Sequence, residues 1–442
     1  MTNTVAISKQ SRATRNIAAA TVGNALEFYD FTVYAAYATT IARVFFPVGD
    51  SFVGLLLSVA TFGLGFLARP LGAVIIGIHS DRRGRKAAMT MTIWMMALGS
   101  LMIAVLPGYD RIGILAPLLL VVARLVQGFS TGGEMGPATA FLVESASARR
   151  IGLAGSWQIA SQQGGTFLSG LLGLILGLSM PPAAVESWGW RIPFLLGVLI
   201  APAGYWIRHS VDETLESSVT LDGAGAVMRR LVRDMPGRVG AAVLMIAGAT
   251  VSQYFFLYGT TYAIRTLHFS AEFARTINLV LGVVGLVCAL AGGWLADRHG
   301  ARPVVVAARL VMAAALYPGF MVVMHDPRPA VFLVVLALLM MAHGIGSGAA
   351  IVILAGLFPM EVRTLGTGLS YALAVTIFGG TAQLVFTALI GVTGSPMSWL
   401  FYIIALSFVS VVPLLSGRMM RVFDNPGGEA GADAPDAARV TS

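Results

Sequence analysis

Long apolar runs separated by short polar stretches extend over the chain from residue 17 to residue 418. A run of at least about 18 apolar residues can cross a bilayer as a helix, so the pattern predicts an all-α membrane protein. Several runs exceed the thickness of the hydrocarbon core, and we expect those helices to tilt. The twelve predicted spans are 17–45, 52–79, 87–107, 113–141, 151–178, 191–208, 238–265, 272–296, 303–324, 328–357, 364–393 and 396–418.

The composition supports this prediction and excludes several functions. Of the 442 residues, 57% are hydrophobic and 11% are charged, whereas a soluble domain carries about 25% charged residues. The single cysteine excludes an intramolecular disulfide. The histidines show no metal-ligand spacing, and we interpret His79 and His343 as isolated and assign no metal. Neither lysine follows a glycine, so the phosphate loop of ATPases is absent. We expect no cofactor and no enzymatic activity.

Basic residues lie mostly on one side of the predicted bundle. An even number of spans places both termini on the same side. If that side is the cytoplasm, 20 of the 29 Lys and Arg residues face it, six face outside, and Arg69, Arg124 and Arg309 lie within spans. This asymmetry is the positive-inside bias of membrane proteins. The net charge of +8 therefore reflects orientation, and we expect cytoplasmic termini and no nucleic-acid partner.

Two polar loops share one sequence pattern. GIHSDRRGRK (77–86) and GWLADRHGAR (293–302) both fit G-x-x-x-D-R-x-G-x-[KR], and they lie 216 residues apart. We infer two duplicated six-helix halves with a substrate cavity between them, which is the architecture of a rocking transporter. The predicted parts are a cytoplasmic N-tail (1–16), a first half (17–208), a central cytoplasmic loop (209–237), a second half (238–418) and a disordered cytoplasmic C-tail (419–442).

These loops are predicted to form a gate at the cytoplasmic side. Their aspartates can accept hydrogen bonds from N–H groups at a neighbouring helix N-terminus. Their arginines can pair with Glu144 or Glu361, and Gly77 permits close helix approach. Alternatively, the loops only anchor the spans at the lipid headgroups. The predicted gate residues are Gly77, Asp81, Arg82, Gly84, Arg85, Glu144, Arg150, Asp297, Arg298, Glu361 and Arg363.

The chain resembles the major facilitator superfamily, and within it the bacterial metabolite:proton symporters. The resemblance rests on GNALEFYDF, ATFGLGFLARPLGAVIIGIHSDRRGRK, LPGYDRIGILAPLLLVVARLVQGFSTGGEMG and WGWRIPFLLG, which cover most of residues 20–215. DRHGAR and LFPMEVRTLGTG extend it to the second half. It implies the twelve-helix major facilitator fold. It also implies proton-coupled uptake of a small metabolite such as a tri- or dicarboxylate, a keto acid, a shikimate-type acid, proline or betaine.

Three carboxylates fall within the predicted spans. A charge at the bilayer centre costs about 2.5–3.5 kcal/mol on insertion scales, so such residues are functional candidates. Glu27 and Asp30 share one helical stripe with Tyr34 and Tyr37. We predict that Glu27 or Asp30 carries the coupled proton, and Glu134 is the further candidate. By depth Asp30 lies close to Arg69, so a purely structural Asp30–Arg69 bridge is the alternative.

The predicted substrate site centres on Arg124. A buried arginine needs a carboxylate, and an anionic substrate can supply one through a bidentate pair. Pairing with Glu27, Asp30 or Glu134 is the alternative. Stripes of Gln on the fifth span and of Tyr on the seventh also suit a polar cavity, although bonds between helices explain them equally well. The predicted substrate-binding residues are Arg69, Arg124, Gln127, Gln158, Gln162, Tyr254 and Tyr258.

The sequence therefore predicts a monomeric symporter of the bacterial inner membrane that imports a small organic anion with protons. A citrate-like tri- or dicarboxylate is the first candidate. The C-tail lacks the long heptad extension of osmosensing relatives, and the resemblance then favours organic acids over zwitterions. The alternatives are a symporter for a zwitterionic osmolyte or an aromatic or cyclic acid, a proton-driven efflux antiporter, and a sensor that binds its ligand without transporting it.

Overall fold

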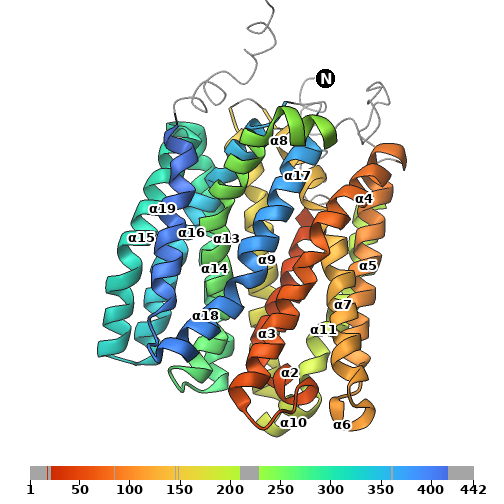
Figure 1. The fold of residues 1–442 in the computed structure, drawn as a ribbon, viewed down its shortest axis with the longest axis vertical. Helices are drawn as coiled ribbons and strands as arrows, with labels where there is room; N and C mark the ends of the chain where they lie inside the picture. Colours follow the sequence, from red (N-terminus) through yellow and green to blue (C-terminus); the bar gives the residue numbers. More distant parts are fainter. Residues whose placement is uncertain are drawn as a thin grey trace, which may run out of the picture.

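The chain folds into a bundle of long helices, as Figure 1 shows. The computed structural model describes residue 17 and residues 21–83, 85–144, 146–147, 149–209, 228–359 and 362–416. This part of the chain contains helices and no β-strand. The two predicted tails (1–16 and 419–442) lie outside it, as do residues 210–227 of the predicted central loop.

The first half begins with a helical segment at residues 21–36, which continues after a turn at Tyr37 as α2 (Ala38–Phe45). Its other elements are α3 (Ser51–Leu67), α4 (Arg69–Arg83), α5 (Arg85–Val105), α6 (Tyr109–Ile112), α7 (Leu115–Gly132), α8 (Met135–Glu144), α9 (Ile151–Ser179), α10 (Pro182–Ser187), the 3₁₀ turn η1 (Gly189–Arg191) and α11 (Ile192–His209).

The second half contains α13, which with 30 residues is the longest of the described helices. Its elements are the π-helical turn η2 (Arg230–Asp234), α13 (Pro236–Arg265), α14 (Ala271–His299), α15 (Ala301–His325), α16 (Pro329–Gly356), α17 (Arg363–Ala374), the π-helical turn η3 (Val375–Gly379), α18 (Gly380–Thr393) and α19 (Trp399–Leu415).

These helices agree with the twelve predicted spans. Eight helical rods in the described residues are long and apolar enough to cross a membrane, and three shorter apolar helices cover Thr90–Val105, Gly189–Leu199 and Trp399–Leu415. The segment 21–45 supplies the remaining span. The predicted and observed boundaries differ by a few residues at most, and the last span ends at Leu415 rather than at 418.

Two broken spans, one from each half, bond to each other. Pro70 has no N–H to donate to the carbonyl of Phe66 four residues earlier, and its ring clashes with that carbonyl, which kinks or breaks a helix. The second span accordingly changes from α3 to α4 between Leu67 and Arg69. Thr376, in the π-helical turn η3, donates its hydroxyl to the Phe66 carbonyl at 2.8 Å. The Phe66 carbonyl that the break leaves free is therefore bonded by a side chain of the other half.

Glycines allow the two halves to approach closely. Where α9 crosses α14, a Cβ on Gly293 would lie 2.4 Å from the carbonyl oxygen of Gly152. Where α3 crosses α18, a Cβ on Gly63 would lie 2.2 Å from the carbonyl oxygen of Gly380. A real Cβ cannot occupy either position, so each crossing requires a residue without a side chain.

We predict that Gly293→Ala destabilises the contact between the halves, because the added methyl group must push α9 and α14 apart. Overpacking of this kind costs about 1–3 kcal/mol. The measurement is the apparent thermal midpoint of the purified protein in detergent. Gly240→Ala is the matched control, since a Cβ at this exposed position of α13 meets nothing within 4 Å. Equal midpoints for the two variants would contradict the prediction.

Candidate functional site

The three predicted proton carriers lie together inside the first half. Glu27 and Asp30 come from the helical segment 21–36, and Glu134 comes from the turn where Gly132 and Gly133 separate α7 from α8. Their exposed fractions are 6%, 3% and 5%. All three line one cavity of about 10 Å³, which is roughly the size of a single water molecule. We call this cavity the acid pocket.

Arg69 pairs with Glu27 and not with Asp30, so the predicted Asp30–Arg69 bridge is wrong. The Nη2 atom of Arg69 lies 3.4 Å from Oε1 of Glu27. The guanidinium also lies over the Phe66 ring, 4.2 Å from its centroid. Side chains three residues apart on a helix point about 60° apart and differ by about 4.5 Å in depth. That offset is enough for Arg69 to reach one acid and miss the other.

Asp30 is connected to Arg124 through two neutral side chains. Ser100 donates its hydroxyl to Oδ2 of Asp30. The Nε2 atom of Gln127 donates to the Ser100 hydroxyl at 3.0 Å, and Nη1 of Arg124 donates to Oε1 of Gln127 at 2.6 Å. We call this chain of hydrogen bonds the Arg124–Asp30 relay. It brings the predicted substrate-binding pair, Arg124 and Gln127, to the predicted proton carrier.

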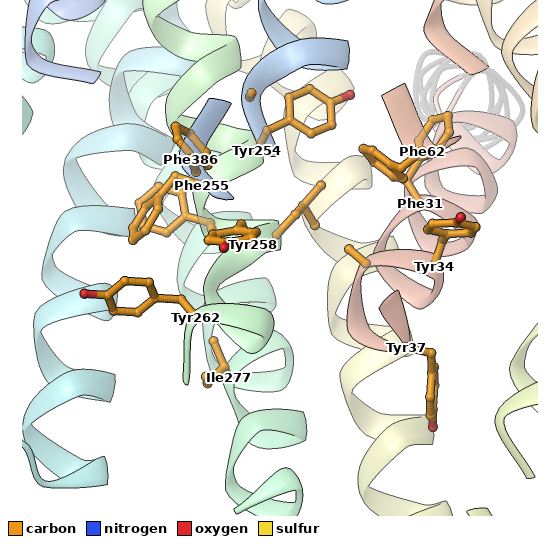
Figure 2. Close-up of a cluster of buried hydrophobic side chains, with 14 of the residues drawn as sticks. Phe31, Tyr34, Tyr37, Phe62, Tyr254, Phe255, Tyr258, Tyr262, Ile277 and Phe386 are labelled. Carbon is orange, nitrogen blue, oxygen red and sulfur yellow. The ribbon is translucent and has the colours of Figure 1, made fainter. Parts of the chain in front are cut away.

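The guanidinium of Arg124 has unused donors. It is fully buried, and its Nε and Nη2 atoms have no hydrogen-bond partner. Within the described residues it forms no ion pair, so the predicted alternative of a direct carboxylate partner is not observed. Aromatic rings surround it instead, and Figure 2 shows three of them on the first-half side. Their centroids lie 4.5–5.1 Å from the guanidinium carbon and belong to Phe31, Tyr34 and Phe62.

A second cavity, of about 60 Å³, lies between the halves. We call it the inter-half cavity. Its first-half wall is formed by Phe28, Ile159 and Gln162, and its second-half wall comes from α13, α16, α17 and η3. The structure therefore places the predicted substrate-binding residues Gln162 and Tyr254 at this cavity. Its polar lining residues are Gln162, Thr250, Gln253, Tyr254, His343, Ser347 and Tyr371.

Two predicted cavity residues instead make contacts between helices. Neither Gln158 nor Tyr258 lines the inter-half cavity. The amide of Gln158 lies 3.0 Å from the sulfur of Met135. The hydroxyl of Tyr258 accepts a hydrogen bond from Thr387 of α18 at 3.1 Å. Figure 2 shows Tyr254, Tyr258 and Tyr262 at successive turns of one helix. A helical stripe nine residues long therefore passes from the cavity into the packed interior.

His343 is not isolated, contrary to the prediction. Its Nε2 atom lies 3.0 Å from Oε1 of Gln253 and 3.4 Å from the Ser347 hydroxyl. Gln163, in the first half, donates to the same Gln253 oxygen at 2.8 Å. This cluster therefore spans both halves. The signal in the sequence was the presence of Gln163, Gln253 and His343 in otherwise apolar spans, but spacing alone could not bring them together.

Polar contacts hold the halves together at one end of the bundle, which we call the basic end and which contains the starts of α9 and α17 and the end of α14. Asp297 accepts hydrogen bonds from the N–H groups of Gly152 at 2.6 Å and of Leu153 at 2.9 Å. The contact predicted for Asp297 is therefore present. Arg363 of the second half pairs with Glu144 of the first half at 3.3 Å.

Other predicted gate residues are placed differently. The Arg298 guanidinium lies over the ring of Trp294 in the same helix, at 4.1 Å. The N–H of Arg150 bonds to the carbonyl of Ser147 at 2.9 Å. A Cβ on Gly77 would make an ordinary contact of 3.7 Å with Leu365, so close helix approach does not require glycine there. The side chains of Asp81, Arg82 and Arg85 lie outside the described part of the structure, as do residues Gly84 and Glu361.

A larger cavity, of about 410 Å³, lies at the end opposite the basic end. We call it the vestibule. Arg43 is paired there with Glu186 at 3.0 Å. Arg265 and Arg275 also line the vestibule, together with His268. The lining thus carries three guanidinium groups and one carboxylate, and the excess of positive charge favours anions.

Comparisons with known proteins agree with this architecture. The family model described as sugar (and other) transporter matches residues 16–235 and 225–415. The chain is 36% identical over 403 residues to the citrate-proton symporter of Klebsiella pneumoniae, covering 90% of this chain and 89% of that protein. It is 34% identical to the alpha-ketoglutarate permease of Escherichia coli K12, covering 92% and 95%. The solved structure of the major facilitator superfamily proton:xylose symporter XylE has the same fold, with a TM-score of 0.76 and 16% identity over 92% of this chain and 95% of that chain.

We predict that Glu27→Gln destabilises the protein by about 3–5 kcal/mol, because it leaves the buried Arg69 guanidinium without a counter-charge. The double variant Glu27→Gln/Arg69→Met removes both charges and should recover most of the loss. Apparent thermal midpoints of the four proteins of this mutant cycle, measured in one detergent, test the prediction. A double variant no more stable than Glu27→Gln would show that the ion pair is not the cause.

Proposed function

The chain belongs to the sugar (and other) transporter family of the major facilitator superfamily, and from this premise we propose that it is a proton-coupled symporter that imports a small organic acid. A citrate-like tri- or dicarboxylate is the preferred substrate, and transport proceeds by alternating access. The names of the citrate-proton symporter and the alpha-ketoglutarate permease support an organic acid. Members of the family are transporters, which agrees with the prediction that the chain is not an enzyme.

The observation that carries the proposal is the buried guanidinium of Arg124. Its Nε and Nη2 atoms are free, and a carboxylate can bind these two neighbouring donors as a bidentate pair. A buried cation without a direct counter-charge is costly, and an anionic substrate would remove that cost. The positive vestibule supports the same class of substrate, since it would concentrate anions at the entrance.

The Arg124–Asp30 relay supplies a physical link between substrate and proton. In the empty protein Arg124 compensates the Asp30 carboxylate through Gln127 and Ser100. A substrate carboxylate at Arg124 would withdraw that compensation and repel the Asp30 carboxylate, and a proton on Asp30 removes the repulsion. Each ligand therefore strengthens the binding of the other, as linkage requires of two coupled sites. Glu27 and Glu134 share the acid pocket with Asp30, so we assign the coupled proton to these three carboxylates together.

The proposed orientation places the basic end and both termini in the cytoplasm, in accordance with the positive-inside bias. The contacts of Asp297 and Arg363 then close the cytoplasmic side, while the vestibule faces outward. These contacts would break when the halves rock and the substrate leaves inward. The proposed location is the inner membrane of a bacterium, and we expect the protein to act as a monomer.

Proteoliposome uptake tests this function. With acid outside, labelled citrate, succinate or 2-oxoglutarate should accumulate above the external concentration, and a protonophore should abolish the accumulation. Shikimate and betaine serve as the cyclic-acid and zwitterion probes. Accumulation of betaine alone would favour the osmolyte alternative. If none of the five probes accumulates, the symport of organic acids is refuted.

We predict that Arg124→Lys raises the KM for the transported acid at least tenfold, because lysine keeps the charge and loses the planar fork that binds a carboxylate bidentately. Arg328→Lys, in the exposed α15–α16 loop, is the matched control and should leave KM unchanged. Initial uptake rates over a range of substrate concentrations provide the measurement. An unchanged KM in Arg124→Lys would show that Arg124 does not bind the substrate.

A further inference from the structure

Arg309, in α15, is a buried cation in the second half that the proposed function does not yet use. It is 2% exposed, and its Nε and Nη2 atoms have no hydrogen-bond partner. No ion pair of Arg309 occurs among the described residues. In the sequence, every acid between residues 238 and 416 lies at or beyond a helix end, at positions Glu272, Asp297, Asp326 and Glu361. Arg309 lies about 12 Å along α15 from its start at Ala301, so the spans of this half offer it no counter-charge.

The charge of Arg309 lies behind the wall of the inter-half cavity. α15 packs directly against α16, and a Cβ on Gly346 of α16 would lie 2.9 Å from the Cβ of Ala308, so Arg309 lies near the turn of α16 that carries His343. His343 itself lines the cavity. Its Nε2 atom contacts Gln253 and Ser347, and its Nδ1 atom has no partner. A positive charge thus lies on the helix packed directly behind the α16 wall of a cavity that both halves form.

The same wall contains further polar groups that suit a carboxylate. Ser347 and Tyr254 line the cavity with His343. The Tyr254 hydroxyl is buried without a hydrogen-bond partner, which is costly unless a ligand supplies one. Hydroxyl and imidazole N–H groups donate hydrogen bonds to carboxylate oxygens, and a low-dielectric setting strengthens such bonds.

We propose that this wall is a second carboxylate site. The hydroxyls of Ser347 and Tyr254 would donate hydrogen bonds to one carboxylate of the substrate, as would the Nε2–H of His343, which Gln253 accepts in the empty protein. Arg309 would neutralise the charge of this carboxylate from behind. The inference rests on the proposed function, because it requires an organic-acid substrate. It narrows that function, since Arg124 and Arg309 belong to different halves. A substrate with at least two carboxylates can use both arginines at once, and a monocarboxylate can use only one.

Calorimetric titration of the purified full-length chain in lipid nanodiscs tests the proposal, with citrate, succinate and butyrate as tri-, di- and monocarboxylate probes. Arg309→Met and His343→Gln should each raise the Kd for citrate at least tenfold and reduce the preference for citrate over butyrate by a similar factor. His325→Gln, at the exposed end of α15, is the control and should bind citrate as the wild type does.

Thermal midpoints distinguish a binding role from a structural one. If Arg309 awaits a ligand, the ligand-free Arg309→Met variant should be at least as stable as the wild type, because it loses an uncompensated charge. Citrate should raise the midpoint of the wild type and not that of the variant. A less stable Arg309→Met variant that still gains stability from citrate would overturn the proposal.

The binding data distinguish failure of the second carboxylate site from failure of the proposed function. If Arg309→Met and His343→Gln both bind citrate with wild-type affinity, the second carboxylate site is refuted while the proposed function stands. If the wild type binds none of the three acids, the proposed function fails, and the inference that rests on it fails as well.

Discussion

The cost of burying charge in a membrane-spanning bundle governs the interior of this protein. Arg69, Arg124 and Arg309 are 1%, 0% and 2% exposed, and a guanidinium cannot become neutral in a protein. Their compensation decreases in that order. Arg69 contacts a carboxylate directly, Arg124 reaches one through two neutral side chains, and Arg309 reaches none in the described part of the chain. Arg69 therefore has a counter-charge inside the protein, and the other two arginines can accept one from outside.

The distribution of these charges fits a protein whose halves move against each other. The buried acids of the described residues all lie in the first half, and two of them lie beside broken helices. Glu27 pairs with Arg69, which follows the break between α3 and α4, and Glu134 lies in the break between α7 and α8. The break at α3 bonds to a break in the second half through Thr376. A change in charge in the acid pocket therefore occurs near the contact surface between the halves. When the halves move against each other, the polar contacts at the basic end must break.

The architecture was predictable from the sequence, and the partners of individual charges were not. Hydropathy predicts twelve spans, and the repeated G-x-x-x-D-R-x-G pattern predicts two halves. Both signals can be read directly from the order of residues along the chain. Helical spacing identified Glu27 and Asp30 as neighbours, whereas the position of Glu134 beside them in the acid pocket was not predicted. Depth cannot fix rotation, so Arg69 was assigned to Asp30 instead of Glu27. A serine in an apolar span gives no signal, which is why the role of Ser100 was not foreseen. His343 was judged isolated because Gln163 and Gln253 lie far from it in the sequence.

The central claim is that binding of an organic acid at Arg124 and protonation of Asp30 are one coupled event. The pH of the lumen of proteoliposomes, recorded while citrate is added outside, tests it most directly, with Asp30→Asn measured beside the wild type. The account predicts that the lumen acidifies with the wild type and that Asp30→Asn admits citrate without this acidification. Alkalinisation of the lumen would indicate an antiporter, and undiminished acidification with Asp30→Asn would contradict the claim that Asp30 carries the proton.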